Sequence, residues 1–99
     1  MNIKVTELAP SWTAHMCASP AVISYDGGIA AAFCDENLCV KAIQIKNGNK
    51  ISVKTDIKSD WNTLDHHAIT LGRDRNGFFH LSGAMHNVPL KYMRTSVPD

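Results

Sequence analysis

The sequence predicts an all-β fold made of antiparallel, four-stranded meanders. Apolar and polar residues alternate with a period of two in several short runs, which is typical of strands with one buried face. Turn-forming residues interrupt these runs roughly every 8 to 12 residues, as in antiparallel sheets with short connections. Apolar residues do not recur at the spacing of three and four that an amphipathic helix requires. We therefore expect little or no helix.

The first group of strands is expected between residues 21 and 55. Its first turn is Asp26-Gly27-Gly28, where glycine can adopt a positive φ without steric cost. Two further turns, at residues 35–37 and 47–49, divide the rest of the group. The expected strands are Ala21–Tyr25, Ile29–Cys34, Leu38–Lys46 and an edge strand at Lys50–Lys54.

A second group, between residues 61 and 97, repeats the order of strand, glycine-containing turn and strand. Its turn is Asp74-Arg75-Asn76-Gly77, and residues 84–87 form the next connection. Before both groups, residues 1–20 are expected to form an extended arm with a short strand at Ile3–Leu8. The expected strands of the second group are Ala68–Leu71, Phe78–Ser82 and Pro89–Thr95.

The two groups can be superposed along the sequence. Asn37 then falls on Asn87 and Lys41 on Lys91, an offset of about 50 residues that is close to the length of a propeller blade. The 99 residues suffice for one domain and about two blades. Two blades cannot close a ring around a channel. We therefore expect an incomplete β-propeller that belongs to a longer protein or self-associates through its open sheet edges.

Charge and hydropathy exclude several classes of protein. Ten Lys and Arg residues balance nine Asp and Glu residues, with no charged block. This predicts neither a nucleic-acid-binding face nor a membrane-surface patch. No apolar run approaches the roughly 20 residues of a membrane span, and the first residues lack the apolar run of a signal peptide. The sequence as written therefore predicts no export.

The three cysteines, Cys17, Cys34 and Cys39, form no CxxC pair. A zinc ribbon or a redox motif is therefore not expected. Cys34 and Cys39 flank one turn, so they either face each other across a hairpin or remain buried free thiols, and the second interpretation is favoured.

Residues Trp61–Thr95 contain motifs that point to a family. They hold Asp65-His66-His67, then the hairpin from Asp74 to Gly83, then Met85-His86-Asn87-Val88-Pro89-Leu90-Lys91-Tyr92. This segment, about a third of the chain, resembles the BNR-4 group of BNR-repeat proteins. That group consists of β-propellers and is similar to ulvan-lyase-type polysaccharide lyases. Residues 21–42 resemble the preceding blade more loosely.

The chain also departs from these patterns. Ala68 stands where the family commonly places an asparagine after its histidine. The Ser-x-Asp-x-Gly box of sialidase-type repeats is not matched either, because Asp74 and Gly77 are three positions apart.

The resemblance implies β-elimination on a polysaccharide that contains uronic acid. This reaction needs a base beside the carboxylate, an acid for the leaving oxygen and a cation or donor that holds the carboxylate. Histidine suits both proton-transfer roles. The resemblance implies His67 and His86 as the catalytic pair, and an antiparallel meander returns both to the same end of the sheet.

The remaining roles follow from the same resemblance. Tyr92 would donate a hydrogen bond or act as the acid, and Arg94 or Arg73 would bind the carboxylate through its planar guanidinium. Asn87 is a further candidate for substrate binding. We expect an acidic polysaccharide or oligosaccharide as the partner and no cofactor.

Other interpretations of these residues remain open. His80 is expected to be a structural histidine with its hydrogen bonds satisfied, and His66 to lie on the surface. A zinc site formed by His66, His80 and His86 is disfavoured, because the spacing matches no compact zinc motif. The alternative to a polysaccharide lyase is that the chain is a non-catalytic carbohydrate-binding or assembly module, or an inactive remnant.

Overall fold

The computed structural model of the protein describes residues 2–11, 20–58, 68–83 and 89–98. In these residues the fold is all-β and antiparallel and contains no helix, which confirms the predicted fold class. It follows that the described residues contain no helix that could cross a membrane. The strands are β1 (Ala21–Tyr25), β2 (Gly28–Cys34), β3 (Cys39–Lys46), β4 (Asn49–Lys58), β5 (Ile69–Arg73), β6 (Phe79–Gly83) and β7 (Tyr92–Arg94).

The strands form two antiparallel sheets. Sheet A has the order β1-β2-β3-β4 and sheet B the order β5-β6-β7, so each is a meander in which neighbours in sequence are neighbours in space. In the first hairpin Tyr25 pairs with Gly28, which leaves Asp26 and Gly27 as a two-residue turn. Gly27 has a φ of 90°, a conformation that glycine adopts without strain.

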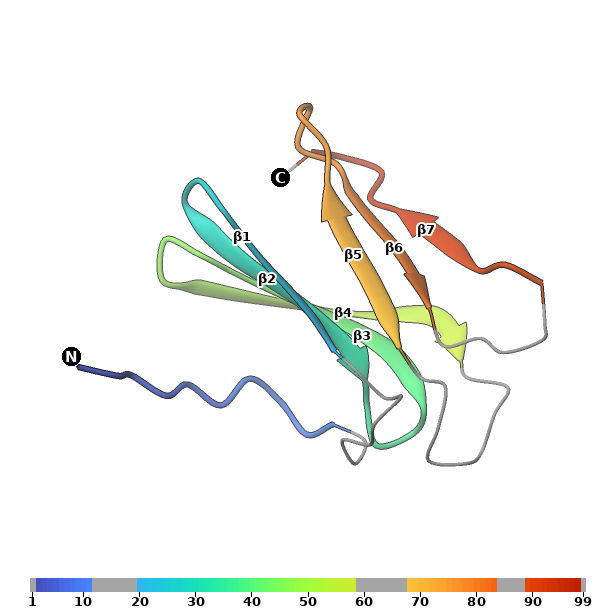
Figure 1. Cartoon of the computed structure of the whole chain (residues 1–99), viewed down its shortest axis with the longest axis horizontal. Helices are drawn as coiled ribbons and strands as arrows, with labels where there is room; N and C mark the ends of the chain where they lie inside the picture. Colours follow the sequence, from blue (N-terminus) through green and yellow to red (C-terminus); the bar gives the residue numbers. More distant parts are fainter. Residues whose placement is uncertain (1, 12–19, 59–67, 84–88, 99) are drawn as a thin grey trace.

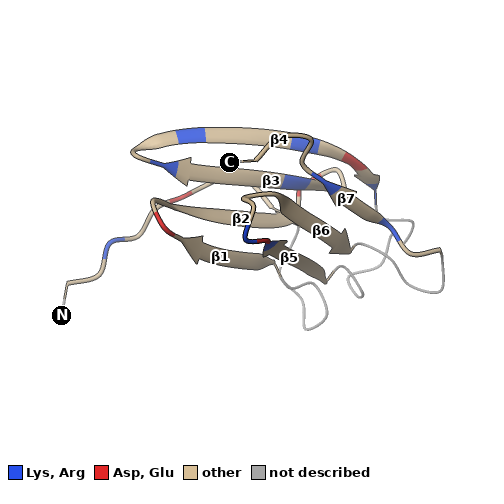
Figure 2. Cartoon of the chain, turned by 90° about the horizontal axis from the view of Figure 1, so that it is seen from above, with Lys and Arg blue, Asp and Glu red and all other residues tan. Residues whose placement is uncertain are grey.

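The two sheets stack on each other with the same strand order. Strand β5 lies against β1 and β2, and β1, β3, β5 and β7 all point in the same direction in Figures 1 and 2. Tyr25 of sheet A packs edge-on against Phe79 of sheet B, with ring centroids 5.4 Å apart. At the opposite end, Lys91 Nζ donates a hydrogen bond of 2.7 Å to the carbonyl oxygen of Lys58.

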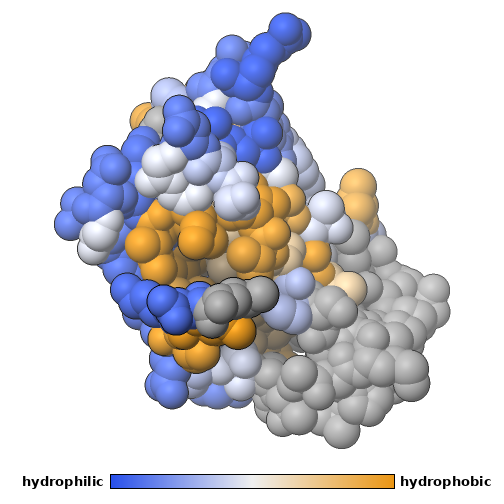
Figure 3. Space-filling view, turned by 60° about the vertical axis from the view of Figure 1, so that its left-hand side comes forward, coloured by the Kyte–Doolittle hydropathy of each residue, from blue (hydrophilic) through white to orange (hydrophobic). Residues whose placement is uncertain are grey.

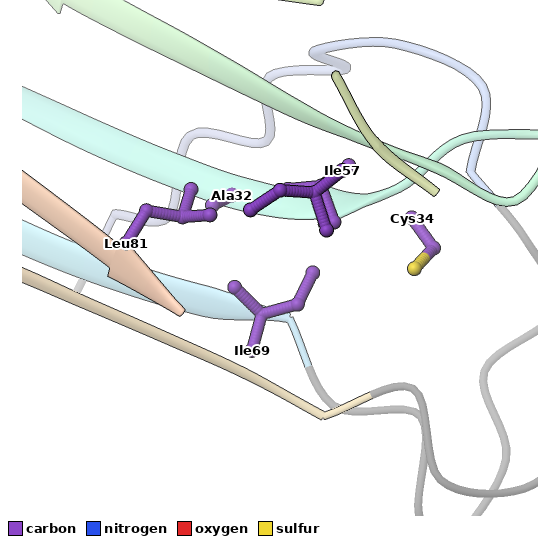
Figure 4. Packing of buried hydrophobic residues seen from close by; sticks show 6 residues of the cluster. Ala32, Cys34, Ile57, Ile69 and Leu81 are labelled. Carbon is purple, nitrogen blue, oxygen red and sulfur yellow. The ribbon is translucent and has the colours of Figure 1, made fainter. Parts of the chain in front are cut away.

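The core lies between the facing sides of the two sheets, which we call their inner faces. Ala32 and Val40 of sheet A are fully buried, and they pack with Ile69 and Leu81 of sheet B (Figure 4). The small side chains of Ala30 and Ala32 face sheet B and allow it to approach closely. Cys34 and Ile57 complete the buried cluster.

Beside this cluster, an apolar groove of about 590 Å³ opens between the sheets. Its walls come from β2, β3 and β4 on one side, and from β5, β6, β7 and residues 95–98 on the other. The apolar side chains that line it include Ile51, Val53, Leu71, Leu81, Met93 and Val97.

Several predicted boundaries change. Residues 3–8 contain no strand, because no neighbouring strand bonds to the described part of the arm. Strand β4 continues to Lys58 rather than ending at Lys54, and β7 contains only three residues. Sheet B has three strands in the described part of the chain, which is the number of strands predicted between residues 61 and 97.

Candidate functional site

The turn between β5 and β6 places a carboxylate at the edge of sheet B. Asp74 N–H donates to the carbonyl of Phe78, and Gly77 N–H donates to the carbonyl of Asp74, both at 3.0 Å. Asp74 Oδ1 accepts the N–H groups of Asn76 at 2.9 Å and Phe78 at 3.1 Å. These bonds hold the side chain in place and leave Oδ2 available for another partner.

Asp35 makes the same turn between β2 and β3. Its Oδ1 accepts the N–H groups of Asn37 at 2.8 Å and Cys39 at 3.0 Å, and Leu38 takes the positive-φ position. Six residues after the aspartate, however, this hairpin carries Lys41 rather than a histidine. The turn alone therefore does not require an imidazole at that position.

A chain of two hydrogen bonds links Asp74, His80 and Tyr92. His80 Nε2 lies 2.8 Å from Asp74 Oδ2, and His80 Nδ1 lies 2.7 Å from the Tyr92 hydroxyl oxygen. Because Tyr92 pairs with Ser82 across the ladder, it lies diagonally opposite His80 on the same face. The two rings stack with centroids 6.0 Å apart and planes at 30°.

The charge on Asp74 decides how the protons are arranged along this chain. The hydrogen bond from His80 lowers the pKa of Asp74 below its ordinary value. Burial opposes this effect, and the N–H groups of Phe78 and Asn76 each add a smaller lowering contribution. An ionised carboxylate only accepts hydrogen bonds, so Nε2 of the imidazole must carry a proton. In the neutral ring, Nδ1 is then an acceptor that faces the Tyr92 hydroxyl.

Arg94 brings a cation to the same face of sheet B. It pairs with His80 across the ladder, and its guanidinium carbon lies 4.9 Å from the centre of the Phe78 ring. A guanidinium that stacks on an aromatic ring still presents its N–H edge to a carboxylate. We call the face formed by His80, Tyr92 and Arg94 the outer face of sheet B.

The structure separates the two arginines predicted to bind a carboxylate. Arg73 lies on the inner side of sheet B, with its guanidinium carbon 4.8 Å from the centre of the Tyr25 ring and 5.9 Å from that of Phe79. Tyr92 and Arg94 lie together on the outer face. Arg94 is therefore the described arginine that shares a face with Tyr92.

The predicted residues His67, His86 and Asn87 lie outside the described residues, as does His66. For His80, the predicted hydrogen bonding within the sheet is confirmed. Asp74 was predicted only as a turn residue, and its bond to His80 was missed. The sequence feature that could have predicted this bond is an aspartate at the start of a tight turn followed by a histidine shortly after the turn.

The described residues contain no group of three His, Cys, Asp or Glu side chains that could hold a metal ion. Two of the cysteines, Cys34 and Cys39, are free thiols as predicted, but only Cys34 of these two is buried, and Cys39 is half-buried. Burial raises the pKa of Cys34 to about 11, with smaller contributions from Asp35 and Cys39, so Cys34 is a poor nucleophile.

By fold and site, the described part of the chain is an all-β structure of two antiparallel sheets with the hydrogen-bonded residues Asp74, His80 and Tyr92 at sheet B. No protein-family model matches the sequence, and no curated protein matches it either.

Proposed function

We propose that the protein acts on polysaccharides that contain uronic acid and cleaves them by β-elimination. The observation that carries this proposal is the hydrogen-bonded chain Asp74–His80–Tyr92 beside Arg94. It supplies a hydroxyl next to an imidazole acceptor, and a cation on the same face.

The chemistry needs these groups in distinct roles. Arg94 binds the carboxylate and stabilises the negative charge that develops when the neighbouring carbon loses its proton. Tyr92 first gives its hydroxyl proton to His80 Nδ1. The resulting tyrosinate then acts as the base and removes the proton from the carbon next to the carboxylate. The C–H electron pair forms a carbon–carbon double bond, and the bond to the leaving glycosidic oxygen breaks. That oxygen takes a proton from an acid at the other side of the sugar.

The resemblance assigns further roles in this proposal. One of His67 and His86 would be the acid that protonates the leaving oxygen, and Asn87 would bind substrate. In sequence, His67 precedes β5 and His86 follows β6, and the adjacent ends of these strands pair Ile69 with Gly83. Tyr92 pairs with the neighbouring Ser82, so these strand ends and Tyr92 lie at the same end of sheet B.

The arrangement of the sheets also supports membership of a β-propeller. The two meanders have the same order and direction and stack face to face, as neighbouring blades do (Figures 1 and 2). In this proposal the described sheets are two blades of an incomplete ring.

The test is the ultraviolet absorbance of the unsaturated product, measured with a panel of acidic polysaccharides. We expect activity in the wild type and a loss of about 100-fold or more in Tyr92→Phe, which keeps the ring but removes the hydroxyl. Arg94→Lys should raise KM, because lysine lacks the planar fork. Arg75→Lys, in the exposed turn, is the matched control. A wild type that produces no unsaturated ends from any of these polymers would contradict the proposal.

Non-catalytic carbohydrate binding is the alternative, and the exposure of Tyr92 favours it. The residue is 58% exposed and stacks on His80, which gives a small aromatic platform for a sugar ring. For this function Tyr92→Phe should bind oligosaccharide like the wild type, whereas Tyr92→Ala should lose binding. Calorimetric titration with oligouronates therefore separates the two functions.

A further inference from the structure

Among the residues that the structure describes, sheet B has no strand opposite β4. Sheet A has four strands and sheet B three, and in the described part of the chain no residue pairs with the outer edge of β7. The inner face of β4 is consequently uncovered. Ile51 and Val53, which pair with Gln44 and Ala42, are 55% and 53% exposed.

Two features of the uncovered surface favour the addition of a strand. No strand of the described residues pairs with the outer edge of β7, and such edges accept added strands. The adjoining groove is apolar and holds Met93 on one wall and Val53 on the other. An added strand would therefore need apolar side chains on its inner face and polar side chains on its outer face.

The described arm, residues 2–11, has this pattern. Ile3 and Val5 alternate with Lys4 and Thr6, and the two apolar residues are 79% and 84% exposed. The arm is extended and runs beside sheet A (Figure 1). Lys50 Nζ of β4 donates a hydrogen bond to the carbonyl oxygen of Leu8 in the arm. Residues 2–7 extend beyond this anchor. Fully extended, six residues span about 20 Å, which is longer than β7.

The arm of the same molecule lies on the wrong side to fill this place. In both Figures 1 and 2 the first described residues and β7 are at opposite sides of the molecule. The side near the arm carries an apolar patch of its own (Figure 3). Exposed apolar residues on the outer face of sheet A include Val22 and Ile29. A second copy can bring its arm to the groove without rearranging either fold.

We propose that the protein self-associates by arm exchange, in which residues 2–7 of one copy add to the edge of β7 in another. Placing Val5 opposite Met93 directs Ile3 and Val5 onto Ile51 and Val53. The same register places Lys4 and Thr6 on the outer face of sheet B. Strand addition of this kind combines backbone hydrogen bonds with alternating side-chain contacts.

Two matched pairs of variants test the proposal on the full chain. Val5→Asp places a charge on the inner side of the arm, and Thr6→Asp places the same charge on its outer side. Ile51→Asp places a charge in the groove, and Ser52→Asp places it on the opposite face of β4. Sedimentation equilibrium should show a self-associating wild type. Association should be weaker by more than about tenfold in Val5→Asp and Ile51→Asp, and almost unchanged in the other two.

Mixing the two defective variants gives the sharpest result. Val5→Asp retains an intact groove and Ile51→Asp retains an intact arm, so one productive interface can form between them. We expect a heterodimer in the mixture although each variant alone is a monomer. A monomeric wild type, equal effects of Val5→Asp and Thr6→Asp, or no association in the mixture would each overturn arm exchange. Far-ultraviolet circular dichroism checks that each variant keeps its β-structure.

Discussion

At the residue scale, Asp74 has two separate tasks. One oxygen closes the β5–β6 turn, and the other orients the imidazole of His80. The comparison with Asp35, which closes the same turn without a histidine, shows that the two tasks are separable. Substitution of Asp74 can therefore change the chemistry of the site while the hairpin remains.

Asp74→Asn should keep the turn and change the proton arrangement. The amide oxygen can still accept the N–H groups of Asn76 and Phe78, whereas the amide nitrogen donates to His80 Nε2. The neutral imidazole must then carry its proton on Nδ1 and donate to Tyr92. Tyr92 would lose its proton acceptor, so we expect turnover to fall with little change in KM. An unchanged turnover number would show that the triad has no part in the reaction.

The same variant should change the dependence of stability on pH. The pKa of Asp74 is below its ordinary value of 3.8 in the folded protein, so the folded state favours the carboxylate. This contribution is present above pH 3.8 and is lost as the pH falls through the lower folded pKa. Urea denaturation at a series of acidic pH values should show a smaller loss of stability on acidification in Asp74→Asn. Asp26→Asn, in an exposed turn, is the control.

The sequence predicted part of the site. Tyr92 and Arg94 were both candidates, and because they are two positions apart in a strand they lie on one face, as the ladder shows. The bond between Asp74 and His80 was not predicted, because it depends on how the turn aims a carboxylate across the hairpin. Periodicity contains no information about that direction.

At the element scale, the strand positions followed from turn chemistry. Asp26-Gly27 and Asp74–Gly77 mark two hairpins within one or two residues of their observed limits. The lengths of β4 and β7 were not predictable in the same way. Edge strands end where their partner stops, and that is a property of the neighbouring strand rather than of local sequence.

Two glycines in strands offer a contrast that tests the packing of sheet A. A Cβ at Gly28 would lie 2.6 Å from the Tyr25 hydroxyl and 2.9 Å from the carbonyl oxygen of Ile45, whereas a Cβ at Gly72 would have no neighbour within 4 Å. Gly28→Ala should lower the free energy of unfolding by about 1 to 3 kcal/mol. Gly72→Ala should leave it unchanged or raise it slightly. Equal thermal melting of the two variants would contradict the close contact at Gly28.

At the scale of the whole molecule, stability depends on contact between the sheets. Leu81 of sheet B packs against the inner face of sheet A near Ala32. Leu81→Ala should cost about 2 to 5 kcal/mol of unfolding free energy in urea denaturation, because it leaves a cavity in this small core. Leu90→Ala, at a residue that is 77% exposed, is the control and should change little. Similar losses in both variants would mean that the sheets do not share a core.

The stacking of the sheets was not fully predictable from the sequence. The repeat of about 50 residues indicated two similar units. Which faces meet depends on register, and register depends on turn lengths such as the two residues between β1 and β2. The vacancy opposite β4 appears only when both sheets are assembled.

The run Ala30-Ala31-Ala32 in β2 has a geometric consequence for assembly. All three residues are buried, so sheet A has little side-chain thickness there on either side. The spacing and tilt between the sheets are therefore set by methyl groups. In an assembly of repeated sheet pairs, a small change of tilt accumulates at every step, and the sum decides whether a ring closes or a helical filament grows. In the proposed propeller, Ala32 would therefore affect curvature on a length scale much larger than its own side chain.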